Sequence, residues 1–258
     1  MPSFDFAQHT DPGRRESNED YLGHHEPATP EEARSHGWLF ALADGVGGHD
    51  RGEIASRAAV EHLLDQFPKA PPGEPPAALL TRLVRSANVH VYENARGGLT
   101  TLVACALRYD RAAIAHAGDS RCYLIRDGAA QQLTRDHTMA QDQAALGLIS
   151  AAQAAAAETR HVLSRSLGRD LFLNVDTSEH TLAPGDVLAL CCDGLYHSVT
   201  PADLSSIAGA GGDLDRAAHR LVDLASQRDG DDNISVQLIR IRGVERVGMY
   251  RGRPYKLR

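Results

Sequence analysis

The sequence predicts an α+β fold in which helices and antiparallel sheets occupy separate layers. Short apolar segments separated by turns follow one another over 100–128, a pattern typical of an antiparallel meander. Two long stretches with apolar residues at helical spacing, 52–66 and 77–95, lie together before this meander. Because strands and helices gather in separate stretches, such layers are favoured over a doubly wound parallel sheet, in which the two types would alternate one by one.

The remaining elements follow in order along the chain. Residues 4–8 and 37–43 show strand-like patterns, and the prolines of 68–76 predict a loop between the two long helices. After the meander, we expect a helix-prone, alanine-rich stretch at 138–160, strands at 171–179 and 186–192, helices at 201–208 and 213–227, and a last strand at 233–241. The series contains no recognisable domain linker, which favours one domain.

The composition narrows the classes of function. The net charge of −7 argues against nucleic-acid binding as the main activity, because a grip on phosphates needs a basic surface. No apolar run approaches the roughly 18 residues of a membrane span, and "MPSFDFAQHT" lacks the features of a signal peptide. The four cysteines lie in apolar stretches without a C-x-x-C motif, which favours buried free thiols over zinc ligands or disulfides. We therefore expect a cytoplasmic protein.

Short acidic side chains follow several apolar runs at the point where each predicted strand ends. Asp44 comes after "LFALA" and Asp193 after "LALCC", and Asp119 and Asp232 also flank predicted strands. Taken singly, such residues are most often turn formers. If the strand ends meet at one edge of the core, however, the carboxylates repel one another unless a cation lies among them. Oxygen ligands of this kind suit Mg²⁺ or Mn²⁺.

Eight segments in a fixed order carry a resemblance to a known family. They are "TDPGRRESNED", "LFALADGVGGHDRGEIAS", "GLTTLVACAL", "AHAGDSRCYLIRDG", "LTRDHT", "VLSRSLG", "LALCCDGLYHSV" and "DDNISVQLI". This set resembles the metal-dependent serine/threonine protein phosphatases of type 2C in their bacterial form. The resemblance implies a four-layer α-β-β-α sandwich, two antiparallel sheets flanked by helices, with a phosphatase domain at 1–242. A basic C-terminal tail at 243–258 would follow this domain.

The resemblance also implies metal ligands by motif position. Asp44 matches the acid that bridges two core ions, which makes it a catalytic residue too, and the carbonyl of Gly45 matches a ligand of the first ion. Asp193 and Asp232 match the ligands of the second ion. Asp119 matches the acid of a weaker third site. The implied cofactors are therefore Mn²⁺ or Mg²⁺, two ions in the core and a third held more weakly.

Further roles follow from the same motifs. Glu19 and Asp20 match acids that hold metal-bound water, and Arg15 matches the arginine that grips the substrate phosphate. Val46 stands where animal members have a histidine proposed to protonate the leaving group, and bacterial members commonly lack that histidine as well. His49, three residues further on, and a metal-bound water are the alternatives for this proton.

The implied reaction is hydrolysis of phosphoserine and phosphothreonine in proteins. A water or hydroxide that bridges the two ions attacks phosphorus, and no covalent phosphoenzyme forms. The implied partners are phosphorylated proteins and a cognate bacterial serine/threonine kinase, and we expect a monomer. The stretch 138–160 matches a variable flap near the site that affects substrate choice.

Two other classes of function stay open. A pseudophosphatase would keep the fold as a binding module without the chemistry, but Asp44, Asp193 and Asp232 are all present. A different two-metal hydrolase would act on nucleotides or sugar phosphates instead of phosphoproteins.

Overall fold

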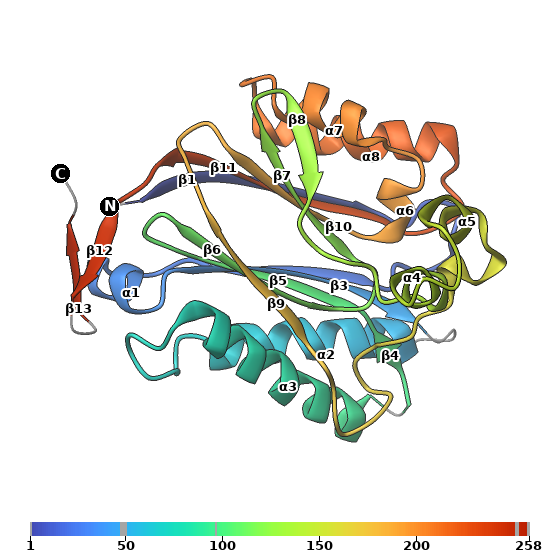
Figure 1. Ribbon diagram of the computed structural model, residues 1–258, viewed down its shortest axis with the longest axis horizontal. Coiled ribbons are helices and arrows are strands. Elements are labelled where there is room, and N and C mark those ends of the chain that lie inside the picture. Colours follow the sequence, from blue (N-terminus) through green and yellow to red (C-terminus); the bar gives the residue numbers. More distant parts are fainter. Residues whose placement is uncertain (1, 47–50, 96, 251–252, 257–258) are drawn as a thin grey trace.

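The computed structural model describes residues 2–46, 51–95, 97–250 and 253–256. These residues form a four-layer sandwich, in which two antiparallel sheets pack face to face between pairs of helices (Figure 1). The first sheet has five strands, in the order β1 (Ser3–Asp11), β11 (Ile234–Gly243), β10 (Val187–Cys191), β7 (Arg121–Arg126) and β8 (Ala129–Gln132). The second has six, in the order β2 (Asp20–His25), β3 (Trp38–Val46), β5 (Leu102–Arg108), β6 (Arg111–Ala117) and β9 (Asp176–Thr181) on its main path, with β4 (Leu99–Thr100) paired to β3. The predicted fold class is confirmed.

The long helices cover the outer faces of the sheets. Helices α2 (Arg51–Gln66) and α3 (Pro76–Asn94) pack on the second sheet, and α7 (Pro201–Ala208) and α8 (Leu214–Arg228) pack on the first (Figure 1). The shorter helical elements are α1 (Pro30–Ser35), α4 (Met139–Ala145), α5 (Ala151–Ala156), the 3₁₀ turn Glu158–His161 and α6 (Asp193–Tyr196). In the basic tail, β12 (Val247–Tyr250) and β13 (Arg253–Lys256) form a hairpin. No helix in the described ranges combines the length and the apolar character needed to cross a bilayer.

Apolar side chains from both sheets fill the space between them. Phe40 and Leu42 of β3 and Leu188 and Leu190 of β10 belong to one buried cluster. On the opposite face of β3, Leu39 packs beneath α2 and α3 in a second cluster. Because both faces of β3 are covered, its sequence is a continuous apolar run instead of an alternating one. Each large apolar side chain buried in this way stabilises the fold by about 1.5–3 kcal/mol, so the end of β3 is firmly positioned.

Several elements differ from the sequence predictions. The strand predicted at 171–179 begins only at Asp176, because Leu173 and Val175 pack against the helical layer as part of a loop. The helix-prone stretch 138–160 is broken at Gly147, whose positive φ of 72° separates α4 from α5. Strand β2 has no counterpart among the predictions, because "DYLGHH" lies at a sheet edge and lacks an apolar run.

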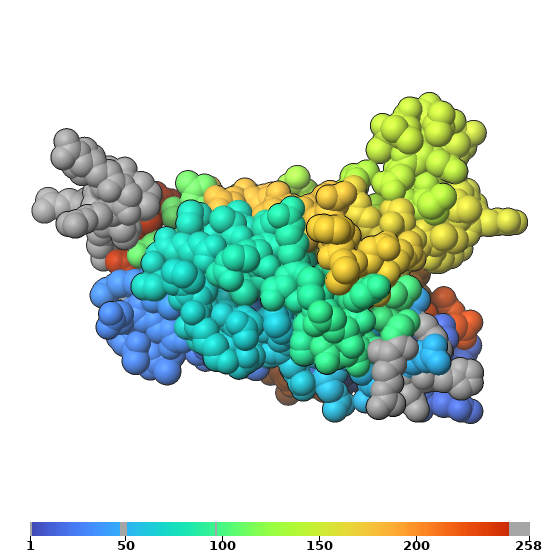
Figure 2. All heavy atoms as spheres, turned by 90° about the horizontal axis from the view of Figure 1, so that it is seen from below, coloured from blue at the N-terminus to red at the C-terminus, as the bar shows by residue number. Residues whose placement is uncertain are grey.

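The segment 138–160 lies at the end of the sandwich where α6 follows β10. Helices α4 and α5, coloured yellow-green, project from the body of the molecule at this end (Figure 2). The predicted acidic residues are found at the same end, next to the projecting segment.

Candidate active site

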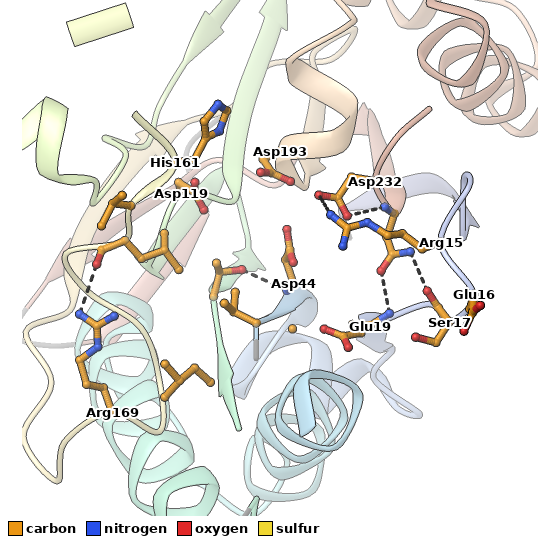
Figure 3. Close-up of a pocket in the computed structure, with 17 residues that line it drawn as sticks. Arg15, Glu16, Ser17, Glu19, Asp44, Asp119, His161, Arg169, Asp193 and Asp232 are labelled. Atoms are coloured by element: carbon orange, nitrogen blue, oxygen red, sulfur yellow. Dashed lines mark hydrogen bonds and ion pairs between the residues drawn. The ribbon is translucent and has the colours of Figure 1, made fainter. Parts of the chain in front are cut away.

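A cavity of about 660 Å³ opens at this end of the sandwich. Four carboxylates line it, those of Asp44, Asp119, Asp193 and Asp232, and they point toward one another from four different segments of the chain (Figure 3). The structure therefore brings together the acids that the sequence places at separate strand ends. The other charged or titratable residues that line the cavity are Arg15, Glu16, Glu19, His161 and Arg169.

Two threonines hold Asp44 at the end of β3. The Asp44 N–H donates to Thr101 Oγ1 at 3.0 Å. Its carbonyl oxygen accepts from the Thr101 N–H at 2.8 Å and from the Thr100 hydroxyl at 2.9 Å. Desolvation within the site raises the pKa of Asp44 well above its ordinary value, and repulsion by neighbouring carboxylates, that of Asp20 first, adds to the rise. A carboxylate in this position is stabilised in its charged form by a nearby cation.

Asp20 lies opposite Asp44 in the pairing of β2 with β3. It is 7% exposed, and neither of its carboxylate oxygens forms a hydrogen bond with the described residues. Burial raises the pKa of Asp20 to about 7. The nearby Cys192 thiol has its pKa raised by burial as well, so it stays protonated and is a poor metal ligand. Because a buried carboxylate without partners is costly, this position fits residues that face a cation or its water.

Asp119 and Asp193 approach from the turn after β6 and from the first residue of α6. Asp119 is buried, and burial raises its pKa to about 7, with repulsion by Asp193 as the next cause. Burial likewise raises the pKa of Asp193 against the opposing effect of His197, and Asp232 adds to the rise. The cluster offers only oxygen donors, a set that suits hard divalent cations such as Mn²⁺ and Mg²⁺.

Arg15 reaches the cavity next to Asp232. Its Nη2 donates to Asp232 Oδ2 at 3.0 Å, and its Nε donates to the carbonyl oxygen of Asp231 at 3.0 Å. The side chain is 58% exposed, so the guanidinium is accessible to an anion. The neighbouring Arg14 pairs with the Asp231 carboxylate at 2.5 Å and is not part of the cavity lining. Of the two adjacent arginines, Arg15 is the one placed at the cavity.

Glu19 and Gly45 line the cavity and are joined through the backbone. The Gly45 N–H donates to the Glu19 carbonyl oxygen at 3.1 Å, and the Ser56 hydroxyl donates to the same oxygen at 2.6 Å. A Cβ on residue 45 would stand 2.3 Å from the carbonyl oxygen of Gly52 and 2.7 Å from that of Glu19. Close backbone packing therefore requires glycine at this position.

Asn233 is a site residue to which no role is assigned from the sequence. Its Nδ2 donates to the carbonyl oxygens of Pro12 at 3.0 Å and Ser17 at 2.9 Å, and its Oδ1 accepts the Glu19 N–H at 2.8 Å. The loop that carries Arg15 is thereby tied to the start of β11. In the sequence the only signal is a polar residue just before an apolar strand, and this does not reveal a partner 214 positions away.

The structure bears on two residues considered for protonation of the leaving group, Val46 and His49. Val46 lines the cavity, is 38% exposed and carries no donor. His49 lies outside the described residues. His161 and Arg169 lie on the wall opposite Arg15 (Figure 3). Neither residue is predicted from the sequence, because both stand apart from any acidic motif.

Comparisons with known proteins find phosphatases. A family model described as "Protein phosphatase 2C" matches residues 4–234. The serine/threonine phosphatase stp of Listeria innocua is 32% identical over 254 residues, which cover 95% of this chain and 96% of the relative. A structure of the S. agalactiae serine/threonine phosphatase has a TM-score of 0.83 at 29% identity and covers 93% of this chain and 100% of its own. The catalytic domain of the phosphatase PstP, in complex with 2 manganese ions, has a TM-score of 0.78 at 29% identity, with 94% and 100% covered.

Proposed function

The chain belongs to the protein phosphatase 2C family, and we propose that the cavity at the end of the sandwich is its active site. The protein is a metal-dependent serine/threonine protein phosphatase. The observation that supports this assignment of the site is the convergence of buried and partly buried carboxylates that repel one another. Asp20, Asp44 and Asp119 have pKa values raised by desolvation and by one another or by Asp193, as expected where cations bind.

The proposed metal ligands are the carboxylates of the cavity. Asp44 would hold both of two Mn²⁺ or Mg²⁺ ions, with the carbonyl of Gly45 on the first. Asp193 and Asp232 would hold the second ion, and Asp119 a weaker third. When bound, the two core ions would neutralise the charge of the phosphate and lower the pKa of the water that attacks phosphorus. The oxygens of Asp20 support this fit, because neither has a hydrogen-bond partner of good geometry among the described residues and burial outweighs the effect of nearby Ser235 and Cys192 on its pKa.

Arg15 would bind the phosphate of the substrate. Its guanidinium can exchange the contact with Asp232 for two parallel N–H···O bonds to phosphate oxygens. Asn233 would keep the Arg15 loop in place through its three hydrogen bonds. Glu19 and Asp20 would accept hydrogen bonds from waters beside the ions and so orient them.

The leaving group would take its proton from solvent. Val46 has no proton to give, although it lines the cavity where the departing serine or threonine oxygen would stand. No side chain becomes phosphorylated in this scheme. The products are inorganic phosphate and the free hydroxyl of the substrate protein.

We further propose a setting for this activity. The substrates would be phosphorylated proteins of the cytoplasm, modified by a cognate serine/threonine kinase. The four cysteines are buried and unpaired, as expected in a reducing compartment. The phosphatase domain would span 1–242, with the basic tail outside it. Helices α4 and α5, which project beside the cavity, would contact the protein substrate (Figure 2).

Release of phosphate from a phosphothreonine peptide tests the proposed function. The reaction should need added Mn²⁺ or Mg²⁺, and EDTA should abolish it. A nucleotide and a sugar phosphate at the same concentration should be hydrolysed far more slowly than the peptide. Full activity in metal-stripped protein would contradict the metal requirement, and faster hydrolysis of the small phosphates would favour the rival class of two-metal hydrolase.

A further inference from the structure

A second group of potential metal ligands shares Asp193 with the oxygen-only cluster and extends from it to the adjoining cavity. We propose that His161, Asp193 and His197 form a regulatory site for Zn²⁺ or another divalent cation that prefers nitrogen ligands. One ligand atom from each of the three residues can be chosen so that all lie within 4.8 Å of one another. His161 ends the 3₁₀ turn that follows α5, whereas Asp193 is the first residue of α6 and His197 caps its C-terminus. A cation bound here would join the projecting segment to the core.

The distances between the ligand atoms suit a bound cation better than direct hydrogen bonds between the side chains. Asp193 and His197 are four residues apart and face the same side of the α6 turn. His197 Nδ1 lies 3.9 Å from Asp193 Oδ2, which is longer than a hydrogen bond. Two ligands of one tetrahedral zinc ion, each about 2.0–2.1 Å from it, are separated by about 3.3 Å. Small side-chain rotations therefore suffice to close the site around an ion.

The donor atoms of the two imidazoles are available. Within the described part of the chain, the ring nitrogens of His161 and His197 form no hydrogen bond, and the two rings meet edge to face at 4.8 Å. The guanidinium of Arg121 lies on the wall of the adjoining cavity, but Asp136 holds it in bonds of 2.9 and 2.6 Å. The charge of Arg121 is therefore partly balanced, although Arg121 and Arg160 still act on His197.

A second cluster of two histidines and one aspartate is a weaker candidate for a metal site. His116, His137 and Asp176 also bring ligand atoms within 4.8 Å. There, however, the Arg165 guanidinium donates to Asp176 at 2.7 Å and lies 3.2 Å from His137 Nε2. A protein cation already occupies the place between these donors. No such cation is bonded to His161 or His197 among the described residues.

The ligand chemistry separates this site from the catalytic one. Two imidazoles and one carboxylate suit Zn²⁺, Co²⁺ or Ni²⁺, whereas an all-oxygen cluster suits Mn²⁺ and Mg²⁺. His161 lines both the catalytic cavity and the adjoining cavity, so an ion that holds it to α6 would fix the wall between the two. Such an ion would also draw on Asp193, a proposed catalytic ligand. We therefore expect it to inhibit phosphate release.

Calorimetric titration of Zn²⁺ into the protein, with Mn²⁺ kept at saturation, tests the site without relying on the phosphatase reaction. Zn²⁺ also exchanges with Mn²⁺ at oxygen sites, so we expect the wild type to bind one Zn²⁺ per chain beyond that exchange. Loss of a partner that only supports a zinc ligand costs about 10–100-fold in affinity, so His161→Ala and His197→Ala should each weaken binding at least tenfold. His90→Ala is the matched control, because His90 belongs to a different histidine pair, stacked with His62 at 4.7 Å, away from this cavity.

Chymotrypsin cleavage provides a second readout of the same binding event. Leu146 and Leu148 lie in the loop between α4 and α5 and are 76% and 70% exposed. Zn²⁺ should slow cleavage at these leucines in the wild type and in His90→Ala, and not in His161→Ala. Melting curves in Mn²⁺ confirm that each variant is folded, and glutamine at the same position replaces alanine in any variant that is not.

Inhibition assays distinguish Zn²⁺ that binds at the histidine site from Zn²⁺ that only displaces Mn²⁺ at the oxygen cluster. Each protein is compared with its own zinc-free rate, and the two histidine variants should need about tenfold more Zn²⁺ for half-inhibition. Equal Zn²⁺ affinity and equal inhibition in wild type, His161→Ala and His197→Ala would overturn the proposal, because Zn²⁺ would then act at the oxygen cluster alone.

Discussion

The side-chain oxygen of Asn233 accepts the backbone N–H of Glu19 at 2.8 Å, across 214 residues of sequence. Together with its two donated bonds, this contact holds the loop that carries Arg15 against the start of β11. Asn233→Ala removes three hydrogen bonds worth about 0.5–1.5 kcal/mol each, so the free energy of unfolding should fall by about 1.5–4.5 kcal/mol. The value of kcat/KM should fall as well, because Arg15 loses its fixed position. Denaturant unfolding and steady-state kinetics on one phosphopeptide measure the two effects.

Asn88→Ala is the matched control for this variant. Asn88 is fully buried, donates to the carbonyl oxygens of Asp170 at 2.8 Å and Leu171 at 3.2 Å, and accepts from the Gly168 N–H at 3.0 Å. It should lose similar stability with a much smaller loss of kcat/KM. Equal kinetic losses in both variants would show that Asn233 acts through general stability alone.

Asp44→Asn should lower activity and raise the stability of the metal-free protein. Removal of one charge relieves the repulsion from the neighbouring carboxylates, so the melting temperature in EDTA should rise. The core ions contribute several kcal/mol of charge stabilisation in the transition state, so kcat should fall by about 100-fold or more. In the wild type, added Mn²⁺ should raise the melting temperature, and in Asp44→Asn this increase should shrink.

Asp186→Asn is the control for Asp44→Asn. Asp186 is 2% exposed, and its carboxylate accepts two bonds from Arg126, at 2.7 and 2.6 Å. Its loss should destabilise the protein in EDTA and in Mn²⁺ alike, because a partner cation is left behind. A lower melting temperature of Asp44→Asn in EDTA would contradict the view that Asp44 is held in a destabilising cluster.

The Asp119 carboxyl should make the metal-free protein less stable as the pH rises. Its pKa is raised to about 7 in the folded state from an ordinary 3.8, so the folded state binds more protons than the unfolded state between these values. Stability therefore falls as pH rises from about 4 to about 7 and changes little above that range. Asp119→Asn should become progressively more stable than wild type across this interval in EDTA. Chemical unfolding at several pH values measures the difference, and a constant difference would contradict it.

Arg15→Ala should lower kcat/KM by about 10–150-fold, because a hydrogen bond to a charged group contributes about 1.5–3 kcal/mol. Arg15→Lys should recover part of this loss, since an ammonium cannot present two parallel donors. Mn²⁺ affinity should not weaken in Arg15→Ala, because Arg15 now competes with cations for Asp232. Arg14→Ala, whose side chain pairs with Asp231, should do little. Equal losses in the two alanine variants would mean that another group holds the phosphate.

The parts of the site that could be predicted are those marked by local sequence. Asp44 and Asp193 end apolar runs whose length reflects strands buried on both faces, so their placement at strand ends follows from the pattern. Asn233 and the pairing of Asp20 with Asp44 could not be predicted in the same way. Both depend on contacts between distant segments, and the edge strand β2 that carries Asp20 has no apolar run to mark it.

The proposed metal-binding carboxylates come from both sheets. Asp44 belongs to a strand of the second sheet, whereas Asp193 follows β10 and Asp232 precedes β11 of the first. A chain in which only one sheet has formed offers only part of the ligands and binds divalent cations weakly. Bound Mn²⁺ therefore stabilises the native state more than the transition state for folding, and it should slow unfolding while leaving the rate of folding nearly unchanged. The ions would then set the lifetime of the native enzyme and not the speed at which it is reached.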